Sequence, residues 1–287
     1  MKKYFFFLLS LFSNSLFSQS NVEIAGIKYR TTTKSNYAIY KSNNNTFDAF
    51  INYGHDLGQN TKLFYHLSYH SFDLHTEINS DNNNLANRFY YPSIPDFSFV
   101  NIASGMTNTL KNKWYLTNIV SFTFSDDFNE SKLKLHSYFR SFSYVKKKKS
   151  PNFTYGFGIY LSKLNTDWRI LPILNLQVQN DKRGMKLFLP RELKFWNRIN
   201  QKSYLELKTI LNSNYLKFTT SLLDSDLLSI NSELTYNYIF KKKLKLKTGI
   251  GLPYTQYKYI SNLDTYQINQ FNISFIIGLS YIIFKKD

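Results

Sequence analysis

The side chains with the clearest catalytic potential lie close together at His66, Ser68 and His70. If this segment is a strand, His66 and Ser68 project to the same face, as a base and its nucleophile must. The residues that alternate with them are apolar: Leu63, Tyr65, Leu67 and Tyr69. On a strand these form the opposite, apolar face, so the three polar side chains point away from it. A general base also needs a polar group that orients it. We identify no such residue on the next strand, so no catalytic residue is expected.

Metal and cofactor chemistry has little support in the sequence. His66 and His70 would lie ~13 Å apart along a strand, too far to share one ion. Asp126, Asp127 and Glu130 lie in a predicted outer loop and could attract a divalent ion, but a calcium site needs about six or more oxygen ligands. The chain has no cysteine, which excludes disulfides and thiolate metal sites. With no Gly-rich phosphate loop either, no metal and no cofactor are expected.

Basic residues are the other candidates for function. The chain has 36 Lys and Arg against 19 Asp and Glu, a formal net charge of +17. Two clusters, Lys146–Lys149 and Lys241–Lys243, are expected in tight turns, where like charges stay solvated. If the chain folds as a β-barrel, as the strand pattern described below predicts, five lysines are candidates for lining its lumen: Lys134, Lys186, Lys208, Lys245 and Lys247. A basic lumen would favour small anionic solutes.

The first twenty residues have the layout of an export signal. Two lysines precede the apolar run Tyr4–Phe12, and small residues follow up to Ser18. That run is too short to span a bilayer as a helix, which needs ~20 apolar residues. We predict a cleaved signal peptide over residues 1–18 and a single domain over 19–287. Export makes a nucleic-acid partner unexpected despite the charge.

An apolar period of two dominates the rest of the chain, and it predicts strands. Near the C-terminus every second residue is apolar: Phe271, Ile273, Phe275, Ile277, Leu279, Tyr281 and Ile283. The pattern gives fourteen segments: 22–30, 46–56, 61–74, 97–110, 114–125, 132–145, 152–163, 168–180, 184–195, 202–211, 215–223, 227–240, 244–260 and 270–284. Many are about 10–14 residues long, against ~5–6 in ordinary globular strands. Segments of this length suit membrane strands, which need ~9–11 residues.

These segments predict an all-β fold, a transmembrane antiparallel up-and-down β-barrel of 12–14 strands. Twelve is the alternative because Pro190 interrupts pairing, and two strands within 184–223 could merge. Every second connection is short, the one at 212–214 included, as expected for the periplasmic turns of such barrels. The last strand ends three residues before the C-terminus, so we expect it to pair with the first strand and to be recognised by the barrel-insertion machinery.

Short motifs in the middle of the chain occur in a characteristic order: Lys113-Trp114-Tyr115-Leu116, Ser125-Asp126-Asp127, Gly156-Phe157-Gly158, Trp168-Arg169-Ile170-Leu171-Pro172, then Gly184 and Leu187-Phe188-Leu189-Pro190. With these motifs, residues 20–287 resemble an uncharacterised family of Gram-negative outer-membrane β-barrels, domain-of-unknown-function family 6268. The resemblance implies the barrel fold and contact with outer-membrane lipid. It implies no site residues, because the family carries no known activity.

The sequence therefore favours a porin-like passive pore or small-solute transport barrel in the cell outer membrane, without a catalytic site. A plugged structural or surface-interaction barrel is the alternative, since Phe64, Tyr160 and Phe188 are bulky and predicted to face inward. A lipid-active outer-membrane enzyme that uses His66 and Ser68 is the remote alternative.

Overall fold

The structure is a computed structural model, and it describes residues 22–33, 35–36, 40–78, 97–127, 136–164, 167–217, 224–240, 243–260 and 265–283. The expected signal peptide lies outside these residues. The described strands are β1 (Val22–Thr32), β2 (Ser35–Asn36), β3 (Tyr40–Asp56), β4 (Thr61–Ile78), β5 (Phe97–Thr109), β6 (Trp114–Asp127), β7 (His136–Ser150), β8 (Phe153–Leu164), β9 (Asp167–Gln179), β10 (Arg183–Leu189), β11 (Glu192–Asn200), β12 (Ser203–Lys217), β13 (Asp224–Phe240), β14 (Leu244–Ile260), β15 (Thr265–Phe271) and β16 (Ser274–Ile283). One 3₁₀ turn, Lys111–Lys113, precedes β6.

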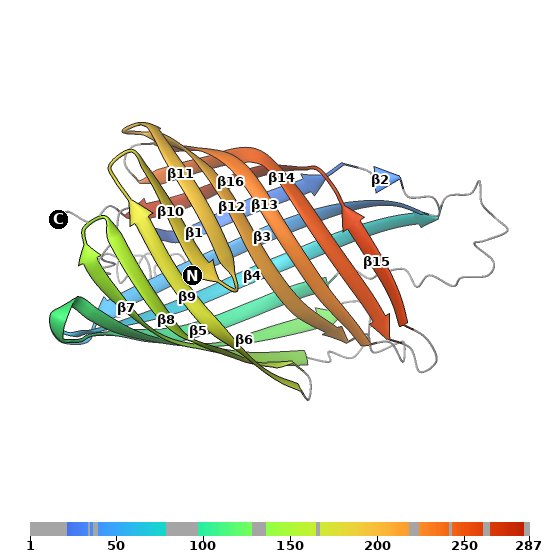
Figure 1. Ribbon diagram of the computed structural model, residues 1–287. Helices are drawn as coiled ribbons and strands as arrows, with labels where there is room; N and C mark the ends of the chain where they lie inside the picture. Colours follow the sequence, from blue (N-terminus) through green and yellow to red (C-terminus); the bar gives the residue numbers. More distant parts are fainter. Residues whose placement is uncertain are drawn as a thin grey trace, which may run out of the picture.

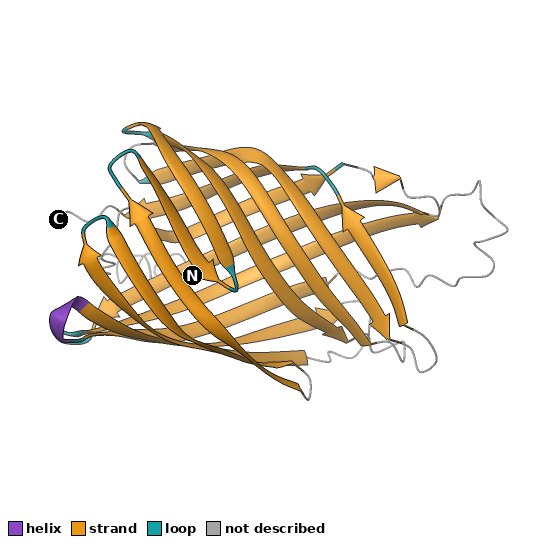
Figure 2. Cartoon of the chain, in the orientation of Figure 1, coloured by secondary structure: helices purple, strands orange, loops and turns teal. Residues whose placement is uncertain are grey.

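The strands form a closed antiparallel barrel (Figures 1 and 2). β1 pairs with β3 on one side and with β16 on the other, where Ile27 lies opposite Leu279. β15 and β16 pair with consecutive parts of β14, and β1 and β2 with consecutive parts of β3. Each couple is one interrupted strand, so the sixteen segments make a barrel of fourteen strands. The predicted pairing of the last strand with the first is confirmed, and it removes both open edges.

The outer wall of the barrel is apolar. Along β16, Phe275 and Ile277 are 57% and 56% exposed, whereas their neighbours Ser274 and Ile276 are 0% and 2% exposed. The same alternation places exposed Ile27 on β1, Phe122 on β6 and Ile159 on β8 on the outside. A continuous apolar wall of this kind is stable in hydrocarbon rather than water, which defines a transmembrane β-barrel. No helix of the described residues is long and apolar enough to cross a membrane.

The strand assignment over 184–223 is wrong in detail, although the total of fourteen is right. The segment predicted as one strand over 184–195 is the hairpin β10–β11, which turns at Pro190. The strand predicted over 202–211 and the start of the strand predicted over 215–223 belong to the single strand β12, which ends at Lys217; residues 218–223 lie outside the described residues. Pro190 has no N–H for a ladder and ends β10. The polar stretch 212–214, expected as a turn, continues β12 because each residue finds a partner on β13.

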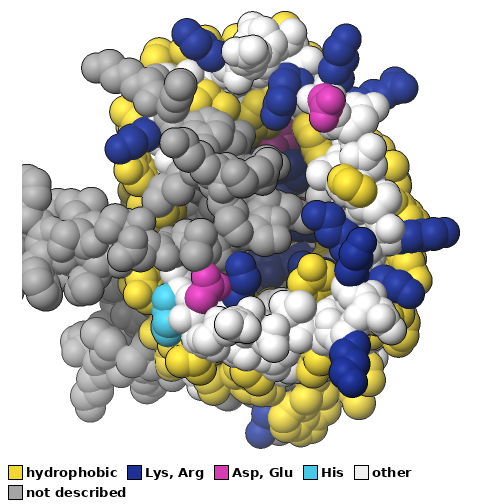
Figure 3. Space-filling model, turned by 90° about the vertical axis from the view of Figure 1, so that its left-hand side faces the viewer, with side chains coloured by type: hydrophobic (Ala, Val, Ile, Leu, Met, Phe, Trp, Pro, Cys, Tyr) yellow, Lys and Arg dark blue, Asp and Glu magenta, His cyan; other side chains and the backbone are white. Residues whose placement is uncertain are grey.

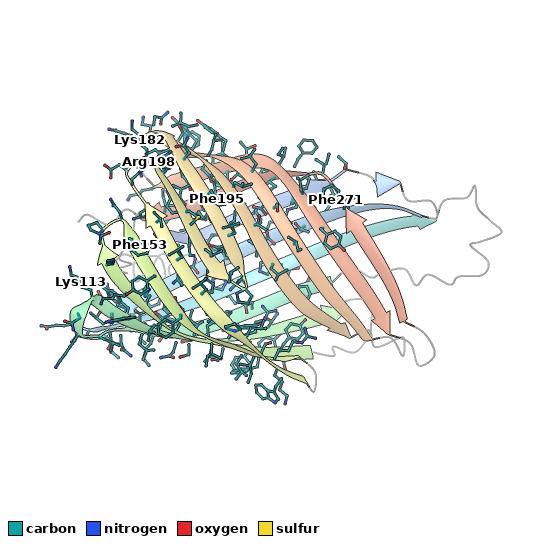
Figure 4. The ribbon with its side chains drawn as sticks, in the orientation of Figure 1. Lys113, Phe153, Lys182, Phe195, Arg198 and Phe271 are labelled. Atoms are coloured by element: carbon teal, nitrogen blue, oxygen red, sulfur yellow. The ribbon has the colours of Figure 1, made fainter. Side chains whose placement is uncertain are left out.

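The placement of Lys146–Lys149 in a turn is also wrong, because all four residues belong to β7. Lys146 lies over the ring of Tyr115 and Lys147 over that of Trp114. Lys113 and Lys182 lie in short turns at this end of the barrel, where Lys182 is close to Arg198 on β11 and Lys113 is on another part of the rim (Figure 4).

The β10–β11 hairpin stops part-way along the wall (Figure 1). Its ladder to β9 ends at the pair Leu189–Leu174, and its ladder to β12 ends at the pair Glu192–Ile210. Beyond these pairs, within the described residues, β9 pairs only with β8 and β12 only with β13. The hairpin tip, Pro190 and Arg191, therefore lies at the depth of the barrel wall rather than at its rim.

Candidate functional site in the barrel lumen

A network of ion pairs fills one side of the lumen. At its centre is Glu233 on β13, which is 2% exposed. Its carboxylate lies 3.2 Å from the Nζ atoms of both Lys28 and Lys247, and it also pairs with Arg30. These partners come from β1 and β14, more than 200 residues away along the chain in the case of Lys28. Barrel closure brings the side chains of β1 close to Glu233, because the inward-pointing side chains of all strands share one interior.

The network continues in both directions around the wall. Lys247 also lies 3.5 Å from Glu206, and Lys194 lies 2.7 Å from the same carboxylate. On the other side, Asp48 on β3 lies 3.0 Å from Lys28 and 2.8 Å from Nδ1 of His70. Buried charges are tolerated where they are paired and hydrogen-bonded in this way.

Four of the five lysines predicted to line a lumen are described, and all four form ion pairs. Lys245 pairs with Glu23, and Lys247 with Glu233 and Glu206. Lys186 and Lys208 lie 3.0 and 3.6 Å from the two carboxylate oxygens of Glu192. Lys134 lies outside the described residues. The structure therefore gathers the lysines of β12 and β14 into one site, while Lys186 on β10 stands outside the cavity defined below.

Aromatic rings occupy another part of the lumen. The ring centroid of Phe142 on β7 lies 4.7 Å from that of Tyr160 and 6.3 Å from that of Phe188. Tyr144 meets Phe188 edge-on at 5.4 Å. These contacts link β7, β8 and β10 across the interior, so the rings narrow the lumen on this side.

A cavity of about 370 Å³ remains among the charged side chains. Eight Lys and Arg side chains line it, against three carboxylates, Glu23, Asp48 and Glu206. Viewed from the end with the short turns, basic side chains occupy the rim and the interior, and hydrophobic side chains form the perimeter (Figure 3). Glu233 and Glu192, which are not part of this lining, pair with four of the eight cations and bring the balance to eight against five. The remaining excess of cations favours a positive potential, which low-dielectric walls strengthen.

Arg191 is the functional candidate that the sequence did not reveal. The hairpin tip carries it into the cavity, where its backbone N–H donates to Phe188 at 2.8 Å and its backbone oxygen accepts from Leu211 at 2.9 Å. Its side chain lines the cavity, where Glu192 attracts its charge, and among the described residues no hydrogen bond or ion pair of the guanidinium is found. The alternation of strand residues does not predict which way Arg191 faces, since Arg191 belongs to a turn. The Pro190 break was the only local signal.

His66 and Ser68 also line the cavity. His66 Nε2 lies 3.1 Å from Ser68 Oγ, and His66 Nδ1 lies 2.6 Å from Oδ1 of Asn52 on β3. The orienting polar residue missing from the sequence interpretation is therefore present, on the preceding strand rather than the following one. Asn52 was missed because its pairing with His66 depends on the hairpin register, and a shift of one residue would turn it outward.

Metal sites gain no support from the geometry. In the described part of the chain, no three His, Asp or Glu side chains are arranged to hold an ion. Asp126 and Asp127, expected in an outer loop, form the end of β6, and Glu130 lies outside the described residues.

The chain matches no protein-family model, so its resemblance to domain-of-unknown-function family 6268 stays a prediction. A search of curated proteins also found no related sequence. Similar solved structures include the COG4313 outer membrane channel from Pseudomonas putida F1, with 8% identity over 94% of this chain and 98% of that one and a TM-score of 0.47.

Two further solved structures also match this chain over most of its length. The deltaS2 mutant of the monoaromatic hydrocarbon channel TodX, a protein of Pseudomonas putida, has 11% identity, covers 96% of this chain and 94% of its own, and has a TM-score of 0.43. LpxR from Salmonella typhimurium has 8% identity, covers 88% and 99%, and has a TM-score of 0.38. Similarities this distant carry no argument about function, which must come from the lumen itself.

Proposed function

We propose that this chain is an outer-membrane pore that favours small anionic solutes. The observation that carries the proposal is the cavity lining, in which Lys and Arg outnumber Asp and Glu by eight to three. Six of the eight cations have a carboxylate partner described above, which holds them in place, and with Glu233 and Glu192 counted an excess of three positive charges remains. Rings of basic side chains select anions in pores by this means.

Arg191 gives the proposed pore its main solute contact. Its guanidinium has five N–H donors, and none of them makes a hydrogen bond within the described residues, although Glu192 attracts the charge. An anion that crosses the cavity can accept these hydrogen bonds in place of part of its hydration shell. The neighbouring cations of β12 and β14 extend the favourable field along the path.

Planar-bilayer recordings of the purified full chain under a KCl gradient test this proposal. We expect a reversal potential that shows chloride preference, and we expect Arg191→Gln to reduce that preference. Arg198→Gln is the matched control, because Arg198 carries the same charge but lies at the short-turn end outside the cavity. Cation preference in the wild-type protein, or equal effects of the two substitutions, would contradict the proposal.

A plugged barrel with a structural or surface-interaction role is the second candidate. The specific observation that favours it is the cluster of rings at Phe142, Tyr160 and Phe188. If these rings close the lumen, the wild-type protein conducts no ions and Phe188→Ala produces conductance. If the wild type already conducts and Phe188→Ala only increases the current, the plugged barrel is rejected.

Export through a signal peptide over residues 1–18 and insertion guided by the last strand are part of the same proposal. The closing ladder between β1 and β16 supports the second step, because insertion requires the final strand to find the first. Membrane fractionation and heat-modifiable gel mobility of the expressed protein test both steps. Recovery in a soluble fraction would overturn them.

A further inference from the structure

The side chains of Asn52, His66 and Ser68 form a hydrogen-bonded chain whose direction the structure fixes. Asn52 Nδ2 donates to the backbone oxygen of Glu23 at 2.8 Å, so its Oδ1 must face His66. Oδ1 then accepts the Nδ1–H of His66 at 2.6 Å, which leaves Nε2 unprotonated in the neutral ring. Nε2 in turn accepts the hydroxyl proton of Ser68 at 3.1 Å.

This order of groups is that of a nucleophile, a general base and the residue that orients the base. The strand geometry explains it, because His66 and Ser68 are two residues apart on β4 and therefore share a face. Asn52 lies directly opposite His66 in the β3–β4 ladder. The nearby pair of His70 and Asp48 lacks the third member, as no hydroxyl among the described residues bonds to that ring.

The chain of three opens into the cavity that holds Arg140 and Arg191. A guanidinium near a serine nucleophile can stabilise the negative charge that develops on an attacked carbonyl oxygen. The same cations would hold an anionic group of a substrate. The site thus combines the groups for acyl transfer with a preference for negatively charged molecules.

We propose that Ser68, His66 and Asn52 form a hydrolytic site inside the barrel for esters of small anionic molecules. Ser68 Oγ attacks the ester carbonyl carbon while its proton passes to His66 Nε2. The tetrahedral intermediate expels the alcohol, which takes that proton, and leaves an acyl group on Ser68. Water then attacks the acyl carbon and gives a proton to Nε2. The bond to Ser68 breaks, the proton returns to Oγ, and the acid is released. The net reaction consumes one ester and one water and yields one acid and one alcohol.

An organophosphorus fluoride tests the nucleophile directly, since the Oγ of an activated serine displaces its fluoride and becomes phosphorylated. The full-length barrel in detergent or lipid is treated with diisopropyl fluorophosphate, and peptide mass spectrometry locates the modification. We expect labelling at Ser68, no labelling in Ser68→Ala, and a loss of about 100-fold in rate in His66→Gln. Ser162→Ala is the matched control, because Ser162 is a buried serine of β8 that does not line the cavity. Heat-modifiable mobility confirms that each variant is folded.

Asn52 is a positioning residue, and its test separates orientation of the base from simple structural support. Asn52→Leu should slow labelling of Ser68 because Nδ1–H loses its acceptor. Asn52→Asp should restore the rate, since a carboxylate oxygen accepts the same hydrogen bond. A structural role predicts the opposite order, because a carboxylate facing the Glu23 carbonyl is worse for folding than a neutral side chain.

Access to the site is measured separately. The natural chain has no cysteine, so Ser68→Cys provides a single thiol for a small methanethiosulfonate reagent. Reaction of that thiol without labelling of wild-type Ser68 by diisopropyl fluorophosphate would overturn the proposal, because the position would be reachable but the serine not activated. Failure of the thiol to react would overturn it as well, since no substrate could enter. Neither result bears on ion selectivity, so this proposal and the proposed pore fail independently.

The substrate class is tested with two chromogenic esters that differ in charge. We expect a several-fold higher kcat/KM for mono-p-nitrophenyl succinate than for p-nitrophenyl acetate, and loss of that difference in Arg191→Gln. Equal values for the two esters in the wild-type protein would reject the preference for anionic substrates.

Discussion

Replacing Glu233 by Gln tests whether the ion-pair network holds the barrel together. The substitution keeps the side-chain volume but removes the charge that faces Lys28, Arg30 and Lys247. A unit charge pair at 3.2 Å attracts by roughly 5 kcal/mol at an effective dielectric of about 20, before desolvation is subtracted. Removing one member of a buried pair costs about 3–5 kcal/mol. Here the buried Arg30 loses its ion pair, whereas Lys28 and Lys247 keep Asp48 and Glu206 as second partners. We therefore expect the free energy of unfolding to fall by about 3–5 kcal/mol.

The assay is urea unfolding of the lipid-reconstituted barrel, followed by tryptophan fluorescence and gel mobility. Asp56→Asn is the matched control, because Asp56 pairs with Lys62 at 3.5 Å at positions that are 29% and 31% exposed. That exposed pair is expected to contribute less than about 1 kcal/mol. Equal losses in the two variants would refute the argument that burial makes the Glu233 network structurally important. The same variant should also show stronger anion preference, since one negative charge is removed from among three lumen cations.

Three further predictions concern the wall and the field of the lumen. Ile277→Arg should destabilise the lipid-inserted barrel by about 2–4 kcal/mol, because Ile277 faces outward; a loss below that of Asp56→Asn would contradict the assigned orientation. Gly156→Ala should cost about 1–3 kcal/mol in urea unfolding, since the new Cβ would overlap the backbone of Val145 and Lys146; unchanged stability would show that the strands can separate there. Raising KCl from 0.1 to 1 M on both sides should weaken the anion preference, because the screening length falls from about 10 Å to 3 Å; a constant permeability ratio would argue against selection by the field.

The sequence determined the class of fold and the facing of most strands. In a strand, successive side chains point to opposite faces, which is a local property of the backbone. This period of two placed the apolar residues of β16 on the outside, and Glu233, Lys245 and Lys247 on the inside. Locally ambiguous segments were assigned wrongly. Pro190 in a predicted strand proved to be a turn, and the polar stretch 212–214 proved to be strand, because pairing with β13 outweighs turn propensity.

Only the tertiary structure decided which polar residues meet. Lys28 contacts Glu233 because the barrel closes and aligns β1 with β13 across the lumen, and no local pattern contains that alignment. Asn52 reaches His66 because the β3–β4 register places them opposite each other, and strand period alone leaves register open. Arg191 faces the cavity because its hairpin stops short of the rim. The sequence thus supplied a barrel with a polar lumen, and closure, register and hairpin length placed the charges and hydroxyls that give the lumen its chemistry.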